Sequence, residues 1–206
     1  SLVFNKPEEK VSKQERQIAK AVSFLIVYGG GAFNLSETMD IPIKRAEKII
    51  SQYAKVYPGI FKYMNRTNAS IEEDGFITTL FKRRRNLPDV RSNIFKIKNR
   101  ALRQGLNFTV QSAASDVLVC AVLGIVNTLR EKNLEATFQA TVHDSLEFVC
   151  PKTETDEVCR IIEDEMVNCN YMQEKVGIKL DIPLSIDLEV GSSFGDGKPY
   201  EYITSN

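Results

Sequence analysis

Apolar and polar positions follow a helical period through much of the chain, most clearly between Ser12 and Gly31. One side of this stretch is apolar enough to anchor a helix on a core, through Ile18, Val22, Leu25, Ile26 and Val27. Ser12 and Glu15 have the spacing of a capping box, which marks a helix start. Gly29 to Gly31 mark its end, because glycine adopts left-handed backbone at little cost. The stretch predicts an amphipathic helix.

The other side of this helix carries a cation or an aromatic ring at every fourth position: Arg16, Lys20, Phe24 and Tyr28. Four residues overshoot a full turn by about 40°, so these side chains form a slanted stripe. Two cations can hold phosphates, and two aromatic rings can stack on a base. An ordinary amphipathic helix, with two solvated cations and two rings in the core, is the alternative interpretation.

The chain up to about residue 90 predicts further helices and a short strand. A short helix or turn is expected over 32–39, a helix from about Pro42 to Pro58, and another from about Gly59 to Glu73 that stops at Asp74-Gly75. Residues 76–81 alternate enough for a short strand. The basic run 82–85 and a turn at 87–89 follow.

The second half mixes one long helix with strands. A helix is expected over about 96–130, bent around 105–108, with residues 113–126 apolar nearly all round and therefore in the core. Residues 136–142 and 146–150 predict a hairpin around His143, Asp144 and Ser145. A helix capped by Thr153 or Thr155 should reach about residue 169, a final strand is expected over 182–190, and an irregular tail from Gly191. Helices precede strands without a βαβ pattern, so the fold class is α+β.

Composition narrows the class of protein. At 206 residues the chain can form one large domain or two modest ones. The longest apolar run, 117–126, is too short to span a bilayer, and residues 1–9 lack the pattern of a secretory signal. The four cysteines have no CxxC spacing and no histidine cluster, which favours free thiols in a reducing compartment over a zinc site.

Charge is unevenly distributed, although the formal net charge is zero. Residues 82–103 contain nine basic side chains and one acidic one, Asp89. Residues 131–189 contain fourteen acidic side chains and five basic ones. This distribution suits a protein that grips phosphates in one place and holds cations in another. A solvated basic loop packed near an acidic helix of the same chain is the alternative.

Several separated segments together resemble one family. The pattern R-x-x-x-K-x-x-x-F-x-x-x-Y-G, residues 16–29, resembles the fingers helix (motif B) of family A DNA polymerases, the bacterial DNA polymerase I type. RQGLNFTVQSAASD (103–116) is similar to the following helix of that family, and TVHDSLEF (141–148) to its motif C hairpin. YPGIFKYM (57–64), LPD (87–89) and EVGSSF (189–194) also fall in the family's order, so the resemblance covers nearly the whole chain.

The resemblance implies a role for each matching residue. Arg16 and Lys20 would hold the triphosphate of an incoming dNTP, Phe24 would pack against its sugar and base, and Tyr28 would stack at the template position. A second set would contact primer–template DNA near the new base pair, on the minor-groove side: Arg103, Asn107 and Gln111.

His143 would lie near the primer terminus, and Asp144 would be a catalytic carboxylate that binds metal. The complete enzyme would use two Mg²⁺ ions, which neutralise charge on the attacking and leaving oxygens, and this chain would not bind both. A simple turn role is the alternative for Asp144, since aspartate is common in turns.

Two departures from the family pattern qualify these expectations. Ser145 stands where the family has an auxiliary glutamate, which weakens metal binding without excluding it. Residues 1–11 contain nothing like the motif A strand, which carries the other essential carboxylate. We therefore expect a C-terminal piece of a polymerase, excised or from a divided gene, with fingers-like helices over 1–100 and a palm-like region with a short antiparallel sheet over 101–206.

The expected function is template-directed nucleotidyl transfer to a primer 3′ end, with little activity from this chain alone. Its partners would be primer–template DNA, a dNTP and the missing portion that carries motif A and the thumb, without a membrane, in the cytoplasm of a bacterial or phage-infected cell. The isolated chain would expose apolar surface and could self-associate. The alternatives are a non-catalytic DNA-binding or assembly subunit that keeps the fold, and a helical scaffold that binds nothing.

Overall fold

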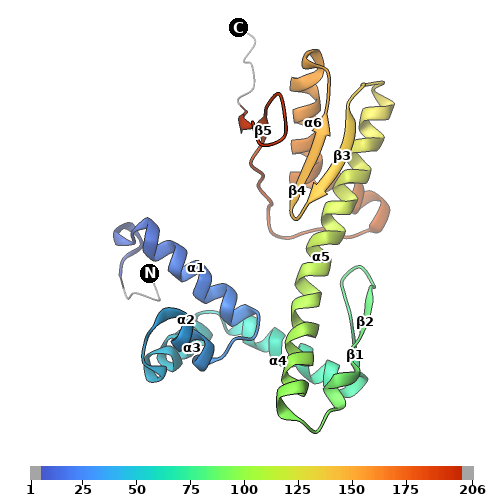
Figure 1. Cartoon of the computed structure of the whole chain (residues 1–206). Helices are drawn as coiled ribbons and strands as arrows, with labels where there is room; N and C mark the ends of the chain where they lie inside the picture. The colour runs from blue at the N-terminus through green and yellow to red at the C-terminus, as the bar shows by residue number, and fades with distance from the viewer. Residues whose placement is uncertain (1–5, 201–206) are drawn as a thin grey trace. The chain divides into compact units, whose positions relative to one another are not determined.

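The computed structural model describes residues 6–200, and the chain divides into two compact units, Ser1–Ala113 and Ala114–Asn206 (Figure 1). The boundary lies inside helix α5 (Phe95–Glu131). Helices dominate the described part of the first unit, whereas the second combines helices with antiparallel strand pairs. The predicted α+β class is confirmed. The proposed division at residue 100 into fingers-like and palm-like regions stays a prediction.

Four helices follow the short 3-10 turn η1 (Glu8–Lys10) in the first unit. They are α1 (Lys13–Val27), α2 (Ala32–Met39), α3 (Ile43–Val56) and α4 (Pro58–Asp74), which confirms the helices predicted over these segments. Pro42 is the N-cap residue of α3, and Gly75 ends α4 in a left-handed conformation at φ 76°. Proline at a helix entrance and glycine at its exit follow their backbone preferences.

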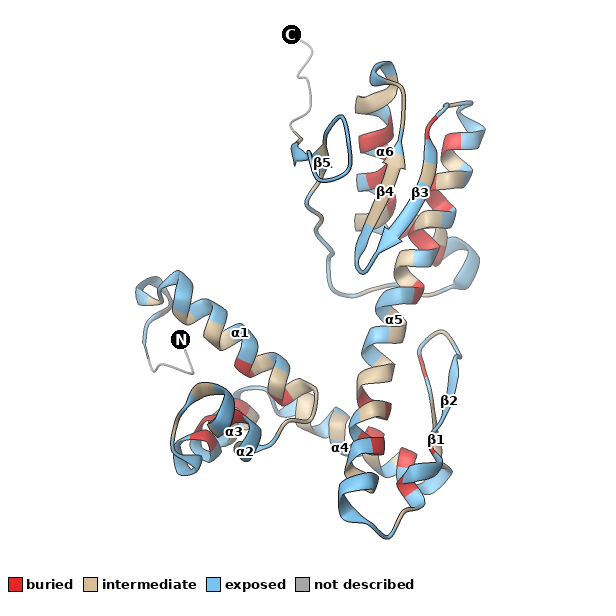
Figure 2. Ribbon diagram, viewed as in Figure 1, coloured by how far each residue is buried: buried red, intermediate tan, exposed pale blue. Residues whose placement is uncertain are grey.

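The first core lies among α1, α2 and α3. Its buried side chains are Val22, Ile26, Leu35, Ala46, Ile49 and Tyr53. Figure 2 shows that burial on α1 is confined to a few positions, and Val22 and Ile26 are each only 1% exposed. The two residues are four positions apart and therefore share one side of the helix. This anchoring fixes which side of α1 faces solvent.

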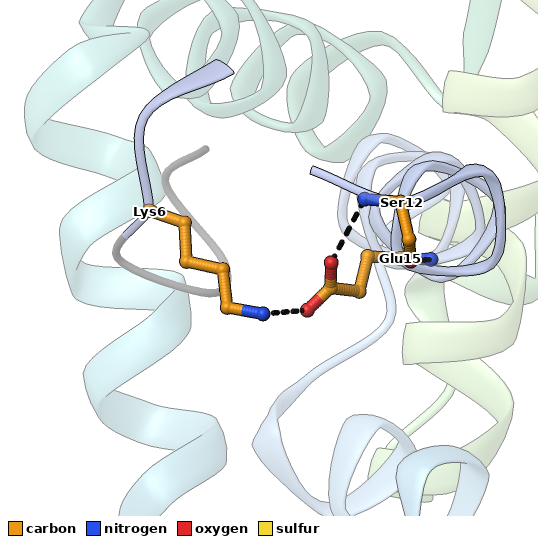
Figure 3. A network of polar contacts seen from close by, with 3 residues as sticks. All are labelled: Lys6, Ser12 and Glu15. Atoms are coloured by element: carbon orange, nitrogen blue, oxygen red, sulfur yellow. Dashed lines mark hydrogen bonds and ion pairs between the residues drawn. The ribbon is translucent and has the colours of Figure 1, made fainter. Parts of the chain in front are cut away.

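The start of α1 carries the predicted capping box (Figure 3). The backbone N–H of Glu15 donates to Ser12 Oγ at 3.2 Å, and the backbone N–H of Ser12 donates to Glu15 Oε2 at 2.9 Å. Lys6 Nζ donates to the other carboxylate oxygen of Glu15. These bonds, chiefly that from Lys6, lower the pKa of Glu15 to about 2. The cap therefore stays ionised far below neutral pH.

A hairpin follows α4, formed by β1 (Phe76–Thr78) and β2 (Arg84–Asn86). The strand predicted over 76–81 is therefore shorter than expected, and the basic run supplies a second strand that the sequence did not predict. Packing explains this strand, because the Arg84 guanidinium lies 3.6 Å from the centre of the Phe76 ring. The presence of arginine does not by itself predict a strand, but the planar guanidinium group stacks well on the face of an aromatic ring.

Helix α5 is continuous through residues 105–108, and the bend expected there stays a prediction. Gly105 allows close packing at this point. A Cβ at this position would lie 2.5 Å from Ile71 Cδ1 and 2.6 Å from Leu87 Cδ1, and both of those residues are buried. The 3-10 turn η2 (Pro88–Arg91) adds Val90 to the same core. The glycine thus lets Ile71 of α4, and Leu87 just before η2, approach the helix.

The second unit places a hairpin against two helices. Strands β3 (Thr137–Val142) and β4 (Ser145–Val149) pair antiparallel, as predicted. The 3-10 turn η3 (Lys152–Glu154) leads into α6 (Thr155–Asn168), followed by the π-helix η4 (Met172–Val176). Buried side chains of α5 and α6 form the core with Ala136: Ile125, Leu129, Val158, Ile161 and Ile162. Leu146 and Phe148 of β4 pack on it.

Three local predictions for the second unit are wrong. Glu154, not a threonine, is the N-cap residue of α6, and it makes no side-chain cap hydrogen bond. Only β5 (Glu189–Val190) of the predicted strand 182–190 is a strand, and it pairs with β6 (Lys198–Pro199), inside the region predicted to be irregular. Ile182 and Leu184 are exposed, so the alternating pattern that predicted the strand is not matched by burial there. The part of the tail beyond residue 200 lies outside the described residues.

The apolar half of α5 is not buried all round. Cys120, Ala121 and Ile125 are buried, whereas Val119 and Leu123 are 47% and 44% exposed. By length and composition α5 could cross a membrane, but one such helix is weak evidence, because core helices of soluble proteins pass the same test. The exposed side matches the apolar surface expected for this chain.

Glu165 is a buried carboxyl group between α6 and α5, only 7% exposed. It accepts a hydrogen bond from the Tyr171 backbone N–H at 2.8 Å, and a Cβ on Gly124 would lie 2.3 Å from its Cδ. Burial raises the pKa of Glu165.

Burial also raises the pKa of the Cys159 thiol to about 11, and all four cysteines are free, as expected.

We predict that Glu165→Gln flattens the pH dependence of stability. Because the folded-state pKa of Glu165 is raised, its favourable contribution is complete below the unfolded pKa and is lost as pH rises through the folded value. Glutamine keeps an acceptor for Tyr171 N–H but does not ionise. Urea unfolding at pH 5 and pH 8 should therefore show the variant gaining stability relative to wild type at the higher pH. An equal difference at both values would contradict this prediction.

We also predict that Gly29→Ala destabilises the first unit by about 1–2 kcal/mol, the cost of left-handed backbone in a residue with a Cβ. Gly29 has φ 78°, and an added Cβ would lie 3.1 Å from Arg103 Cγ. Gly31→Ala is the matched control, since Gly31 has φ −91° and nothing lies within 4 Å of its Cβ position. Thermal unfolding should separate the two variants, and equal losses would show that the Gly29 conformation is not required.

Candidate functional site

The stripe predicted on α1 faces solvent. Arg16 and Lys20 are exposed, Phe24 is 48% exposed and Tyr28 is half-buried, on the side opposite Val22 and Ile26. Lys20 Nζ lies 5.8 Å from the centre of the Phe24 ring. The Phe24 and Tyr28 rings stack at 6.0 Å between centres with 12° between their planes. The structure therefore brings Lys20, Phe24 and Tyr28 together as a continuous surface.

A second stripe lies on the part of α5 within the first unit. Arg103 and Gln111 are exposed and Asn107 is half-buried, and their spacing of four residues aligns them along the helix. The Arg103 side chain lies beside Gly29, directly after Tyr28. The aromatic end of the α1 stripe is thus next to the first residue of the α5 stripe.

Asn107 carries an unmet hydrogen-bond requirement. Its Oδ1 atom is buried and has no hydrogen-bond partner among the described residues. Buried polar atoms are nearly always paired with protein or water, so an unpaired one needs an explanation. Asn68 Oδ1 on α4 is in the same state, so an unpaired amide oxygen does not by itself mark a binding site.

His143 and Asp144 form the two-residue turn between β3 and β4, where Val142 pairs with Ser145. Both side chains are exposed. His143 has φ 57°, a left-handed conformation that is uncommon outside glycine and in which histidine, asparagine and aspartate are enriched. The tight turn holds the Asp144 carboxylate at the tip of a paired hairpin, where a ligand can approach it.

Ser145, which follows Asp144, forms its hydrogen bonds within the β3–β4 hairpin. Its hydroxyl donates to the Val142 carbonyl oxygen at 3.1 Å and to Glu147 Oε1 at 3.2 Å. Among residues 6–200 no group of three or more His, Cys, Asp or Glu side chains could hold a metal ion. A carboxylate such as that of Asp144 is the kind of hard oxygen ligand that Mg²⁺ prefers, and a complete site would need ligands from elsewhere, such as substrate phosphates.

The predicted residues therefore fall into two groups. Seven belong to the first unit, on α1 and α5, and two belong to the hairpin of the second unit. The structure adds one feature that the site prediction left out, the exposed cationic strand β2 beside Phe76. The run of four basic residues was the signal that could have found it.

Comparison with known proteins identifies the family. A family model described as DNA polymerase family A matches residues 1–196. DNA polymerase I of Bacillus caldotenax is 33% identical over 196 residues, and that of Pseudomonas aeruginosa is 34% identical over 194 residues. The matches cover 95% and 94% of this chain but only 21% and 20% of those proteins, so the chain spans about a fifth of their length.

A solved structure agrees with the sequence matches. The POL domain of Pol1 from M. smegmatis, in complex with DNA primer-template and dNTP, superimposes with a TM-score of 0.82 at 26% sequence identity. The match covers 90% of this chain and 31% of that one. This chain therefore belongs to DNA polymerase family A.

Proposed function

We propose that this chain supplies the nucleotide-binding helix and one metal-binding carboxylate of a template-directed DNA polymerase. The exposed stripe on α1 is the observation that carries the proposal. A purely structural role would place Phe24 in the core, but its ring is 48% exposed and stacks on Tyr28 beside Lys20. Rings and cations side by side suit a nucleotide, whose base stacks and whose triphosphate needs positive charge.

Each residue has a physical role in this proposal. Arg16 and Lys20 bind the triphosphate, while Phe24 packs on the sugar and base of the dNTP. Tyr28 stacks at the template position. Because Arg103 lies beside Gly29, the α5 stripe continues from the nucleotide end of α1.

The α5 stripe contacts primer–template DNA. Arg103 and Gln111 are exposed for contact, and Asn107 lies between them on the same side of α5. The M. smegmatis relative is described in complex with primer-template DNA and dNTP, which supports the same partners for this chain.

Asp144 is the proposed metal ligand, and His143 is placed beside the primer terminus. Bound Mg²⁺ would neutralise negative charge on the oxygens of the transferred phosphoryl group. The protein's part is to present the Asp144 carboxylate at a rigid turn, exposed to solvent and substrate. Since Ser145 donates to Glu147 Oε1, we do not include Glu147 among the ligands.

The 206 residues by themselves contain one of the two carboxylate positions that the family uses. We therefore propose that this chain alone extends primers poorly, and that it works together with residues that carry motif A and the thumb. The same reasoning predicts cytoplasmic action on DNA, without a membrane. The exposed apolar residues Val119 and Leu123 suit further protein contacts, including self-association of the isolated chain.

A non-catalytic DNA-binding or assembly subunit is the second candidate function. Ser145 in place of the family's glutamate favours it, because metal binding at the hairpin is then weaker. The exposed cation–aromatic stripe and Asp144 at the turn favour the catalytic proposal.

We predict that activity appears only on reconstitution and depends on Asp144. The purified chain should give little primer extension, and adding a polypeptide with the motif A strand and thumb of a family A polymerase should restore it. Asp144→Ala in the mixture should then reduce the rate at least about 100-fold, typical for loss of charge stabilisation in a transition state. Gel-resolved primer extension measures both effects.

The matched control for this experiment is Asp181→Ala, which removes an exposed carboxylate outside the hairpin. It should leave the rate unchanged. Equal activity with and without the Asp144 carboxylate would exclude the catalytic proposal and favour the non-catalytic subunit. Robust extension by the unmixed chain would contradict the need for the second carboxylate.

We further predict that Lys20→Ala weakens binding of a fluorescent dNTP to the chain about tenfold or more. A hydrogen bond to a charged group contributes about 1.5–3 kcal/mol. Lys13→Ala is the control, since Lys13 is an exposed lysine at the other end of α1. Titration by fluorescence anisotropy gives both affinities. If the two variants bind alike, or wild type shows no saturable binding, the stripe does not hold the triphosphate.

A further inference from the structure

Two hydrogen bonds in series join α4 to the backbone of α5 within the first unit. The Tyr63 hydroxyl on α4 donates to Thr109 Oγ1 at 2.7 Å, and the Thr109 hydroxyl donates to the Leu106 carbonyl oxygen at 2.7 Å. A threonine hydroxyl has one proton to donate and lone pairs that accept, so Thr109 uses both capacities at once. The nucleotide and DNA contacts proposed above use none of these three residues.

Thr109 lies on the side of α5 that packs against the core, away from the α5 stripe. Successive residues of an α-helix are about 100° apart, which puts Thr109 about 160° from both Asn107 and Gln111. It shares its side of the helix with Gly105 and with Leu102, which is 9% exposed and belongs to the core. A tie on this side therefore sets the rotation of the helix, and with it the direction in which the stripe points.

The bond reaches a stretch of α5 that lacks buried side chains. Leu106 is 3% exposed, but within the described chain none of residues 107–115 is buried. Asn107 and Gln111 belong to this stretch, so hydrophobic packing holds them less firmly than it holds the preceding turn. The Tyr63 hydroxyl provides a directional contact there.

Helix α4 connects this contact to the core beneath α1. Ile60 and Phe61, just before Tyr63, pack against the core of α1, α2 and α3. Further along α4, Ile71 is buried in the core that contains Leu102. The helix is therefore anchored on both sides of Tyr63, which fixes where the phenolic hydroxyl lies.

A contribution to stability alone is the competing interpretation of this bond. The Tyr63 side chain is 37% exposed, and a hydrogen bond at such a position adds little net stability, because water replaces a lost partner. Orientation is more demanding, since binding groups must lie within about 0.5 Å and 10–20° of their productive geometry. Loss of a directional tie should therefore affect binding more than it affects folding.

We propose that Tyr63 is a positioning residue for DNA binding that acts through Thr109 on the α5 stripe. The bond holds α5 in the rotation at which Asn107 and Gln111 face the same ligand as Arg103. This inference rests on the proposed function, in which the stripe contacts primer–template DNA. It assigns no direct contact between the Tyr63 side chain and DNA.

The test measures the affinity of the full 206-residue chain for a primer–template duplex by fluorescence anisotropy. Tyr63→Phe removes the donor but keeps the ring, and Thr109→Val removes the acceptor but keeps the shape of the side chain. Each substitution should weaken binding about threefold to tenfold, the range that corresponds to one net hydrogen bond. The double variant should bind no more weakly than the weaker single variant, because both changes break the same bond.

Two further variants separate positioning from a loss of folded protein. Thr109→Ser keeps the hydroxyl and should bind like wild type. In a Gln111→Ala background, Tyr63→Phe should have a smaller effect than in wild type, because part of what it positions is absent. A loss of folded chain would lower the affinity by the same factor in both backgrounds.

Tyr57→Phe is the matched control, since it removes a hydroxyl from an exposed ring next to the start of α4. It should bind like wild type, and circular dichroism of each variant checks that the helices are intact. A loss of affinity equal to that of Tyr63→Phe would overturn the inference.

The inference is also overturned if Tyr63→Phe binds like wild type, if Thr109→Ser binds as weakly as Thr109→Val, or if Tyr63→Phe has equal effects in both backgrounds. In those cases a loss of affinity in Gln111→Ala shows that the α5 stripe still contacts DNA, so only the role of Tyr63 fails. Absence of binding by wild type, or an unchanged affinity in Gln111→Ala, overturns the proposed DNA contact of the stripe and this inference with it.

Discussion

The burial of Val22 and Ile26 fixes which side of α1 faces solvent, and the exposed stripe of cations and rings depends on this orientation. Both residues are 1% exposed and pack in one core with Leu35 and Ala46. A helix has only one orientation that buries this pair, and that orientation turns the opposite stripe outward. The apolar side of α1 thus decides where the cations and rings point. Without this anchoring, two large aromatic rings would turn inward, because burial of a ring is favourable.

Two glycines, Gly29 and Gly105, allow close contacts that position α5 in the first unit. Gly29 ends α1 in a left-handed turn and leaves room for the Arg103 side chain. Gly105, two residues further along α5, admits Ile71 and Leu87 at distances that a Cβ would forbid. The α5 stripe is therefore positioned by contacts on both sides of Arg103. Well-packed supports of this kind hold binding groups in place more accurately than loops do.

Regular elements of this chain can be predicted from sequence where the signals lie within the element itself. The capping box, the glycine stops and the helical period of α1 are local features, and the structure has each of them. The failures came from contacts between distant residues. The strand β2 depends on the stacking of Arg84 on Phe76. The alternation over 182–190 predicts a strand, but side-chain burial follows this alternation only from Ile186 onward. Propensity and periodicity carry no information about such partners.

The same distinction applies to the candidate site. Spacing placed Arg16, Lys20, Phe24 and Tyr28 on one stripe, but only the structure shows that the Phe24 ring is exposed. That exposure removes the interpretation in which the Phe24 ring belongs to the core, whereas its role toward a nucleotide stays a proposal. The unpaired oxygen of Asn107 is likewise invisible in sequence, since it depends on what surrounds the amide.

The turn at His143 and Asp144 has a backbone conformation that few residues adopt. Two-residue turns favour asparagine and glycine, which adopt left-handed backbone readily. His143 adopts φ 57° there instead, at a cost of about 1–2 kcal/mol relative to glycine. Nothing in the packing requires a histidine, because its side chain is exposed. Left-handed backbone also occurs at Asp40 and Cys169, where it ends α2 and α6. The turn thus presents the Asp144 carboxylate to solvent at the tip of a paired hairpin, and its role as a metal ligand stays a proposal.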